Sequence, residues 1–342
     1  TGAGAGIALL FMFLLYRYQS PALRRKAKRD EGLTESYERS ALLLLFTMLP
    51  ILFSSTVYNI SSVLDDFLYS SIMTSLGSKT KQIVMEWGIF GEYHVLFNIP
   101  VALANALSSS LIPALTMAVA SHDRQKTLSQ IRVSIRFTLL IAVPCSIGMA
   151  VLADPLSRML FPGKNVHLLI QLTRVGSFAV LLYSLSTITN AILQGLGHLN
   201  LPLYHSMVAL VLHLLSLVLF LYAGLGIYGV VLSNIVFALI MCFLNQRAIF
   251  RHTRFRIDLF RSLVMPMLSG LIMGGAAYVI YFVIYILLPE GLRKGRVGSA
   301  MYLLPAVFIA ILIYFFLLLK SHTLTREDLD EMPMGGRLKR FL

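Results

Sequence analysis

Long apolar segments with few or no charges place the strongest constraint on how this chain can fold. A helix needs about 20 such residues to cross a bilayer, and buried helices of soluble proteins rarely come in such a series. Only 13 % of the 342 residues are charged, about half the usual share of ~25 %. The sequence therefore predicts an all-α fold, a polytopic transmembrane helical bundle. We place about nine spans at residues 2–16, 44–73, 89–119, 133–153, 175–194, 203–223, 227–246, 263–288 and 299–319.

The distribution of positive charge predicts the orientation of these spans. Cytoplasmic loops of membrane proteins are rich in Lys and Arg. With alternating spans, 21 of the 29 Lys and Arg residues fall on one side and 7 on the other. The richer side holds segments 17–43 and 321–342, which we interpret as a basic cytoplasmic linker and a cytoplasmic tail. The net charge of +13 would suit a nucleic-acid partner, but the cations lie between spans and form no continuous surface. We therefore expect a multi-pass protein of the cell membrane that binds no nucleic acid.

Four phrases carry a resemblance to a known family. Residues Phe97–Leu115 combine an early Pro with small residues and a closing Ser-Leu-Ile-Pro, and Ile192–Met207 contains Leu-Gln-Gly-Leu-Gly followed by Pro. Residues Pro144–Gly163 contain Leu-Ala-Asp-Pro and then Leu-Phe-Pro-Gly, and Val57–Leu68 has an Asn followed by Asp. In this order and spacing the phrases resemble the MOP flippase superfamily, in particular the branch of stage V sporulation protein B and the Gram-positive lipid II flippases.

The resemblance implies a domain organisation. The family fold has two six-helix bundles around a central cavity, with two extra helices in this branch. Mapped onto it, residues 1–16 are the last helix of a first bundle whose other five helices would precede this chain, and 17–43 are the linker. Residues 44–250 are the second six-helix bundle and 251–320 the two additional helices. In the family the cations that hold the lipid pyrophosphate come largely from the first bundle, so no position here carries them.

Two adjacent acids inside a span, Asp65 and Asp66, are the sharpest candidates for a site. An ionisable group at the bilayer centre costs about 2.5–3.5 kcal/mol on insertion scales, so it needs a partner, water or a function. Neighbouring residues lie about 100° apart around a helix, so at most one of the two points squarely into a cavity. That carboxylate could bind a cation or a proton, or pair with an Arg of the other bundle. Alternatively, the two acids form a hydrated pair near the outer interface.

A half-polar stripe runs along the span that starts near residue 89. Its members recur at three- and four-residue spacing and so share one helix face: they are His94, Asn98, Val101, Asn105 and Ser108. Such a stripe favours the wall of a wet cavity, although hydrogen bonds between helices explain Asn and Ser in membranes nearly as well. Glu92 opens the same span from the outside and joins the candidates.

Further polar groups have two interpretations each. Arg174 could reach a phosphate with its guanidinium fork, or extend to lipid headgroups from the end of its span. Asn190 and Gln194 share a helix face and either line the cavity or join helices. His205 and His213 lack a third ligand at metal spacing, so we expect a structural role in the core. Gly270 and Gly274, spaced as Gly-x-x-x-Gly, predict close helix packing or the border of a groove for a lipid tail.

The motifs of enzymes are missing from the sequence. It has no nucleophile elbow, phosphate loop, HExxH or CxxC pattern, so we expect neither an enzyme nor a cofactor nor a bound metal. Our leading hypothesis is a flippase for a lipid-linked saccharide in peptidoglycan, spore-cortex or polysaccharide synthesis. Its partners would be membrane lipids, an undecaprenyl-pyrophosphate glycan such as lipid II, and a coupling ion. One alternative is an ion-coupled efflux antiporter of the same superfamily, with Asp65 or Asp66 taking the ion. The other is a non-transporting membrane scaffold.

Overall fold

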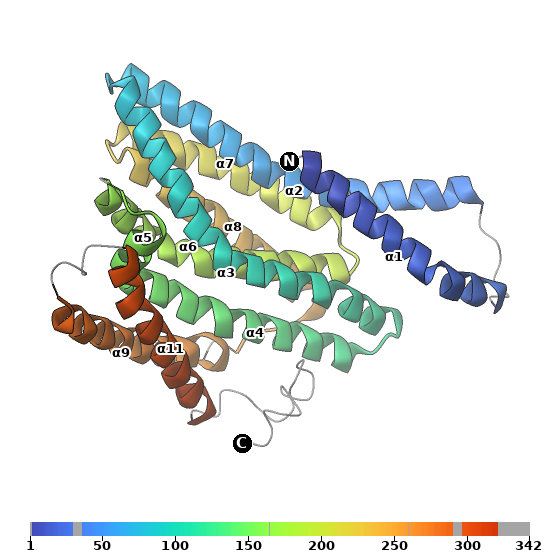
Figure 1. Ribbon diagram of the computed structural model, residues 1–342. Coiled ribbons are helices and arrows are strands. Elements are labelled where there is room, and N and C mark those ends of the chain that lie inside the picture. The colour runs from blue at the N-terminus through green and yellow to red at the C-terminus, as the bar shows by residue number, and fades with distance from the viewer. Residues whose placement is uncertain (1, 30–35, 164, 259, 290–295, 321–342) are drawn as a thin grey trace. The chain divides into compact units, whose positions relative to one another are not determined.

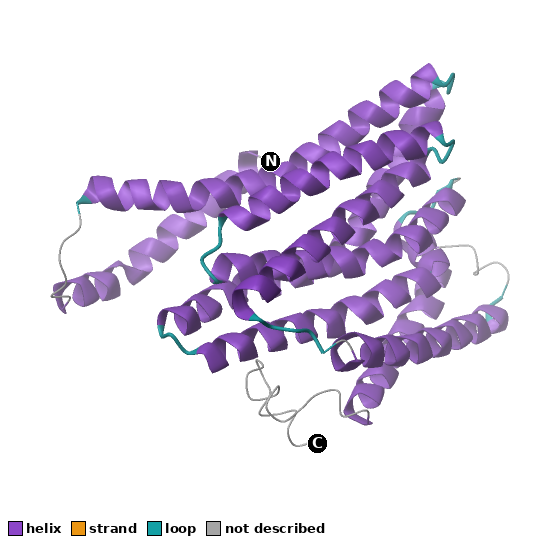
Figure 2. Cartoon of the chain, turned by 180° about the vertical axis from the view of Figure 1, so that it is seen from behind, coloured by secondary structure: helices purple, strands orange, loops and turns teal. Residues whose placement is uncertain are grey.

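The computed structural model describes residues 2–29, 36–163, 165–258, 260–289 and 296–320, and within them the ordered elements are helices without strands. Figure 1 labels the helices, and Figure 2 shows the loops and turns that join them. The elements are α1 (Gly2–Arg29), α2 (Tyr37–Ser75), α3 (Thr80–Ala120), α4 (Arg124–Val151), α5 (Ala153–Leu160), α6 (Val166–Gly195), α7 (Asn200–Tyr222), α8 (Ile227–Thr253), the π-helical turn η1 (Phe260–Val264), α9 (Met265–Leu287) and α11 (Arg296–Lys320).

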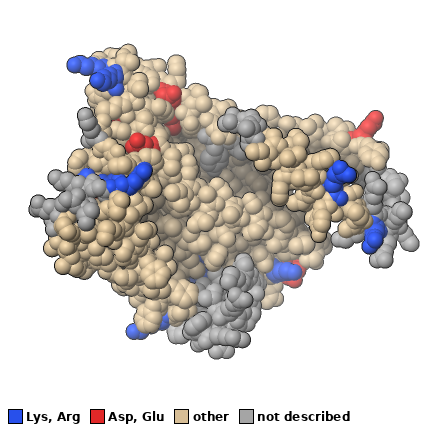
Figure 3. All heavy atoms as spheres, viewed as in Figure 1, with Lys and Arg blue, Asp and Glu red and all other residues tan. Residues whose placement is uncertain are grey.

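Eight of these helices are long and apolar enough to cross a membrane, namely α2, α3, α4, α6, α7, α8, α9 with its leading π-turn, and α11. This confirms the predicted all-α polytopic fold. The face in Figure 3 carries only scattered Lys, Arg, Asp and Glu, and large apolar side chains are exposed along the helices, for instance Leu215 on α7 and Phe316 on α11. Such surface would drive aggregation in water, whereas lipid tails can cover it.

The helices differ from the predicted boundaries in three places. The linker predicted at 17–43 is largely helical where described, because α1 runs to Arg29 and α2 begins at Tyr37. The first predicted span, 2–16, lies within α1, which is not one of the eight candidate membrane helices. The short helix α5 was not predicted. The length of an apolar segment indicates only the part of a helix that lipid surrounds, so it predicts neither polar helix extensions nor short helices. The predicted tail 321–342 lies outside the described residues.

The chain divides into two compact units, Thr1–Met48 and Leu49–Leu342. The second unit is organised around α6, which contacts α3, α4, α5, α7 and α8. More than half of the α6 membrane span is buried (56 %), the highest share of any span. Small residues allow this close packing. Gly176 lies directly against the ring of Tyr93 on α3, whose hydroxyl donates to the Gly176 carbonyl oxygen at 3.3 Å.

Of the two last helices, α9 packs against α4 and α11 against α5, and the two pack against each other. The predicted Gly-x-x-x-Gly contact is present: a Cβ on Gly270 would lie 2.7 Å from Ile147 Cδ1, and one on Gly274 2.7 Å from Ile147 Cγ2. The Tyr314 hydroxyl on α11 donates to the Leu140 carbonyl of α4 at 3.0 Å. The helices α9 and α11 are therefore joined closely to α4 and α5.

We expect Gly176→Ala to lower the free energy of unfolding by about 1–3 kcal/mol, the usual cost of overpacking a core. The added methyl group would overlap the Tyr93 ring, which is buried and has Phe90 and Phe97 as ring neighbours. The measurement is thermal unfolding of the purified chain in detergent. Gly148→Ala on α4 is the control, because nothing lies within 4 Å of its Cβ position and Ala favours the helix. Equal unfolding midpoints for both variants would contradict this account of the α3–α6 contact.

Candidate functional site

A cavity of about 830 Å³ lies within the second unit, between α2, α3, α6 and α8. Aromatic rings form part of its wall, including Trp87, Phe97 and Tyr183. Hydroxyl and amide side chains form most of the remainder: Ser54, Asn59, Ser61, Ser62, Asn98, Asn105, Ser108, Ser109, Thr187, Asn190, Gln194 and Asn234. These groups donate and accept hydrogen bonds without carrying charge, so the cavity offers a neutral polar surface.

The half-polar stripe of α3 lies along this cavity. Its five members, His94, Asn98, Val101, Asn105 and Ser108, all belong to the lining. The Asn98 amide contacts His94 Nδ1 at 3.0 Å, and the Ser108 hydroxyl donates to the Ala104 carbonyl at 2.8 Å within the helix. These bonds are local to α3. None of these bonds joins the stripe to another helix. The Asn105 side chain lines the cavity.

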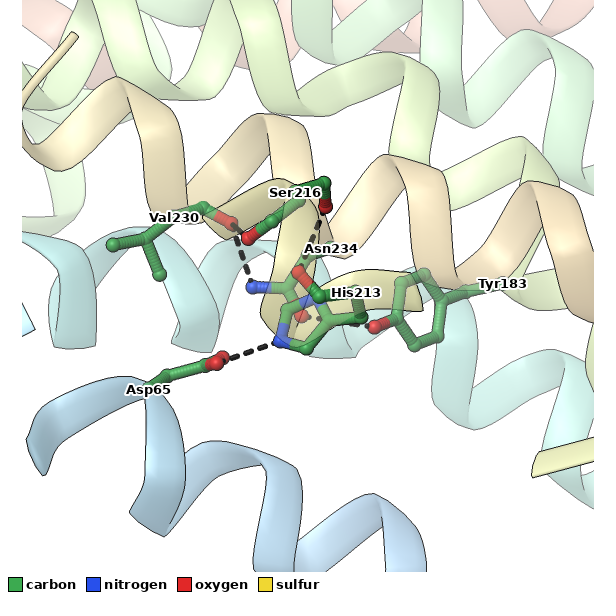
Figure 4. A network of polar contacts seen from close by, with 7 residues as sticks. Asp65, Tyr183, His213, Ser216, Val230 and Asn234 are labelled. Carbon is green, nitrogen blue, oxygen red and sulfur yellow. Dashed lines mark hydrogen bonds and ion pairs between the residues drawn. The ribbon is translucent and has the colours of Figure 1, made fainter. Parts of the chain in front are cut away.

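Asp65 and His213 form an ion pair beside the cavity, with His213 Nε2 at 2.6 Å from Asp65 Oδ1 (Figure 4). Asp65 on α2 lines the cavity and is 3 % exposed, and His213 on α7 is fully buried. Asp66, one residue further along α2, is exposed and does not line the cavity. Of the two adjacent acids, Asp65 thus points inward and Asp66 elsewhere.

The surroundings of the Asp65–His213 pair are polar and uncharged. His213 Nδ1 is buried and has no hydrogen-bond partner among the described residues. Close by, the Tyr183 hydroxyl donates to Asn234 Oδ1 at 3.1 Å, and Asn234 Nδ2 donates to the Val230 carbonyl at 3.0 Å (Figure 4). The carboxylate therefore sits in a wall of neutral polar groups.

A second buried network joins α6, α7 and α8. Asn245 is fully buried, and its Nδ2 donates to Asn190 Oδ1 at 2.8 Å and to Thr189 Oγ1 at 3.1 Å. Its Oδ1 accepts from His205 Nδ1 at 2.7 Å. Asn190 also lines the cavity, so this residue joins the helices and contributes to the wall. His205 is a structural member of the network.

Two more predicted candidates lie away from the cavity. Glu92 is half-buried on α3 but outside the lining, and Arg174 is exposed on α6. Glu92 lies two residues before His94, which rotates it about 200° away from the stripe. Asp66, Glu92 and Arg174 therefore lie outside the cavity lining, and a role for them in a site stays a prediction.

The sequence prediction missed several lining residues, among them Tyr183, Thr187 and Asn234. A signal existed on α2, where Ser54, Ser61 and Asp65 recur at seven and four residues and so share a face. The described residues contain no group of three His, Cys, Asp or Glu able to hold a metal ion.

Eight helices that are long and apolar enough to cross a bilayer, with a polar cavity between four of them, define the class of the protein: it is an integral membrane protein. The family follows from comparison. The family model described as lipid II flippase MurJ matches residues 3–292. The chain therefore belongs to the lipid II flippase MurJ family, and the resemblance to the MOP flippase superfamily is confirmed.

Three Bacillus subtilis (strain 168) proteins show how this chain relates to longer ones. The uncharacterized membrane protein YabM is 23 % identical over 343 residues, which cover 99 % of this chain and 62 % of YabM. Stage V sporulation protein B is 22 % identical, with 98 % and 62 % covered. Lipid II flippase MurJ is 23 % identical, with 92 % and 58 % covered. The chain thus spans about three fifths of the length of these relatives.

Solved structures with the same fold are transporters of the MOP superfamily. An outward-facing multidrug resistance MATE family transporter has a TM-score of 0.53 at 18 % identity, covering 82 % of this chain and 62 % of that one. A MOP superfamily transporter from Pyrococcus furiosus has a TM-score of 0.52 at 15 % identity, covering 80 % and 67 %. At these identities the likeness concerns the fold alone.

Proposed function

We propose that this chain is part of a flippase that moves a lipid-linked saccharide across the cell membrane by alternating access. The substrate class is an undecaprenyl-pyrophosphate glycan, with the peptidoglycan precursor lipid II as the leading candidate. The observation that carries the proposal is the cavity of about 830 Å³ with amide, hydroxyl and aromatic walls in a chain of the lipid II flippase MurJ family. Amides and hydroxyls can exchange hydrogen bonds with sugar hydroxyls, and aromatic rings cover the apolar faces of sugar rings.

The charge of the cavity constrains how the pyrophosphate would be held. The described lining contains no Lys or Arg, and Asp65 is its one carboxylate. A pyrophosphate requires cationic partners, so in this proposal the rest of the intact transporter supplies them. This chain would then contact mainly the glycan part of the substrate. Such a protein translocates its substrate without covalent chemistry, so we propose no enzymatic activity.

An ion-coupled efflux antiporter is the second candidate, and the Asp65–His213 pair is the observation that favours it. A carboxylate in an otherwise neutral wall could attract a cationic substrate or take up a coupling proton. Family membership and the two additional helices α9 and α11 favour the flippase. In either case we propose Asp65 and His213 as the coupling site.

Depletion of the resident lipid II flippase in a bacterial host tests the proposed function. The intact transporter containing this chain should restore growth and lower the pool of undecaprenyl-linked precursor that accumulates inside the cell. Failure to restore growth, together with resistance to cationic drugs, would favour the antiporter.

Labelling of single cysteines tests the predicted orientation, which places the α2–α3 connection outside and the end of α8 inside. Lys79→Cys should react with an impermeant maleimide in intact cells, whereas Arg251→Cys should react only after the membrane is made permeable. Both residues are exposed, so accessibility to the reagent depends on the side of the membrane. Reversed labelling would show that the charge distribution had been misinterpreted.

A further inference from the structure

A second, smaller pocket of about 280 Å³ lies at the end of the bundle where α3 meets α4 and α8 ends. Three segments that are far apart in sequence converge there, around residues 119–128, 196 and 252–254. The members that can carry positive charge are His122, Arg124, His252 and Arg254. The predicted topology assigns all three segments to the same, cytoplasmic, side. Their convergence forms a strongly basic pocket.

Two of these basic residues have an unusual backbone conformation. His122 follows α3 with a φ of 54°, and Arg254 follows α8 with a φ of 60°. Glycine is the residue that usually ends a helix in this left-handed region, because it has no Cβ. Here an imidazole and a guanidinium occupy the two positions and face the pocket. Each chain reversal therefore contributes a basic group to the pocket.

The described carboxylates leave this charge without ion-pair partners. The two ion pairs among the described residues are Asp154–Arg158 and Asp65–His213, and neither involves the pocket. The nearest acid in sequence, Asp123, accepts a hydrogen bond from the Lys126 backbone N–H at 2.9 Å and caps α4. The N-terminus of α4 adds a partial positive charge. An anion in this pocket would therefore meet cations that no described carboxylate pairs with.

A further histidine lies beside the basic pocket. His198, from the turn between α6 and α7, lies with its ring centroid 3.9 Å from that of His252. Burial, together with the charge of His252, lowers the pKa of the His198 imidazole. The turn between α6 and α7 thus adds another imidazole beside the basic pocket.

We propose that this basic pocket binds a phosphate group, either the monoester of a lipid headgroup at the membrane surface or a free phosphate compound. Arg124 and Arg254 would each offer a planar pair of N–H donors to phosphate oxygens, and His122 and His252 would complete the shell. The pocket has room for a phosphate or pyrophosphate, and its volume is about a third of that of the larger cavity. It is separate from the larger cavity, and the proposal does not depend on the flippase function.

Native mass spectrometry of the purified chain in detergent tests the proposal with two probes. One is inorganic pyrophosphate, and the other is phosphatidic acid, compared with diacylglycerol, which lacks only the phosphate. We expect at least one probe to bind and the double variant Arg124→Gln/Arg254→Gln to weaken its binding by about tenfold or more. Binding of phosphatidic acid alone identifies a lipid headgroup as the ligand, and binding of pyrophosphate alone identifies a soluble compound.

The double variant Arg132→Gln/Arg251→Gln is the matched control. It removes the same charge from residues of α4 and α8 that are exposed like Arg124 and Arg254 but do not line the pocket, so it should retain binding within about twofold. The single variant Arg124→Gln keeps Arg254 in its left-handed backbone conformation. Weaker binding by this variant is therefore not caused by misfolding at Arg254. Equal losses in the two double variants, or binding of neither probe to the unaltered chain, would overturn the proposal.

Discussion

Replacement of Asp65 by Asn should depress transport by the intact transporter by about tenfold or more, whereas Asp66→Asn should change it by less than about twofold. Asn retains the shape of Asp65 and can still accept a bond from His213, but the pair loses its charge. A charge-assisted hydrogen bond contributes about 1.5–3 kcal/mol and a neutral one about 0.5–1.5 kcal/mol, so the transporter should still assemble. Asp66 is exposed and points away from the cavity.

Complementation of a deletion strain, with membrane expression measured in parallel, checks this prediction. His213→Leu is a useful companion, because it would leave the buried Asp65 charge unpaired at a cost of about 3–5 kcal/mol. That variant should express poorly, and adding Asp65→Asn to it should restore much of the expression. If both single Asn variants and the double Asn variant complement as well as the parent, Asp65 has no part in transport.

The chain on its own should fail to translocate a lipid-linked sugar. Alternating access requires two bundles that rock against each other around a shared site, and this chain spans 62 % of the length of YabM and of stage V sporulation protein B. The measurement uses vesicles that contain the purified chain and a labelled lipid-linked sugar, whose exposure outside is followed with an added enzyme. Exposure should match that of protein-free vesicles, and a clear excess would show that one bundle suffices.

The sequence predicted the membrane-crossing helices well because lipid contact demands a long apolar segment, a purely local property. It did not predict α5, or the extension of α2 and α3 to 39 and 41 residues, because those parts do not need to be long and apolar. Within the cavity, the α3 stripe was predictable from helical spacing alone. The partner of Asp65 was not, because His213 lies 148 residues away and only the tertiary arrangement of the helices brings the two together.

The basic pocket shows the same limit. Arg124 and Arg254 counted toward the predicted cytoplasmic charge in the sequence, but their convergence depends on how α3, α4 and α8 end. Likewise, the sequence identified Asn190 as a candidate without indicating its partner, and the structure joins it to Asn245 on α8 by a hydrogen bond of 2.8 Å. A polar residue in a span predicts that a partner exists, but the identity of that partner is a property of the packed helices.

Translocation by the intact transporter, reconstituted into vesicles with a labelled undecaprenyl-pyrophosphate glycan, is the most direct test of the proposed function. The account predicts that the glycan becomes exposed to an external enzyme faster than in protein-free vesicles, and that Asp65→Asn removes most of this excess. A reconstituted transporter that expels a cationic dye in response to an ion gradient but leaves the glycan on its original side would contradict the account.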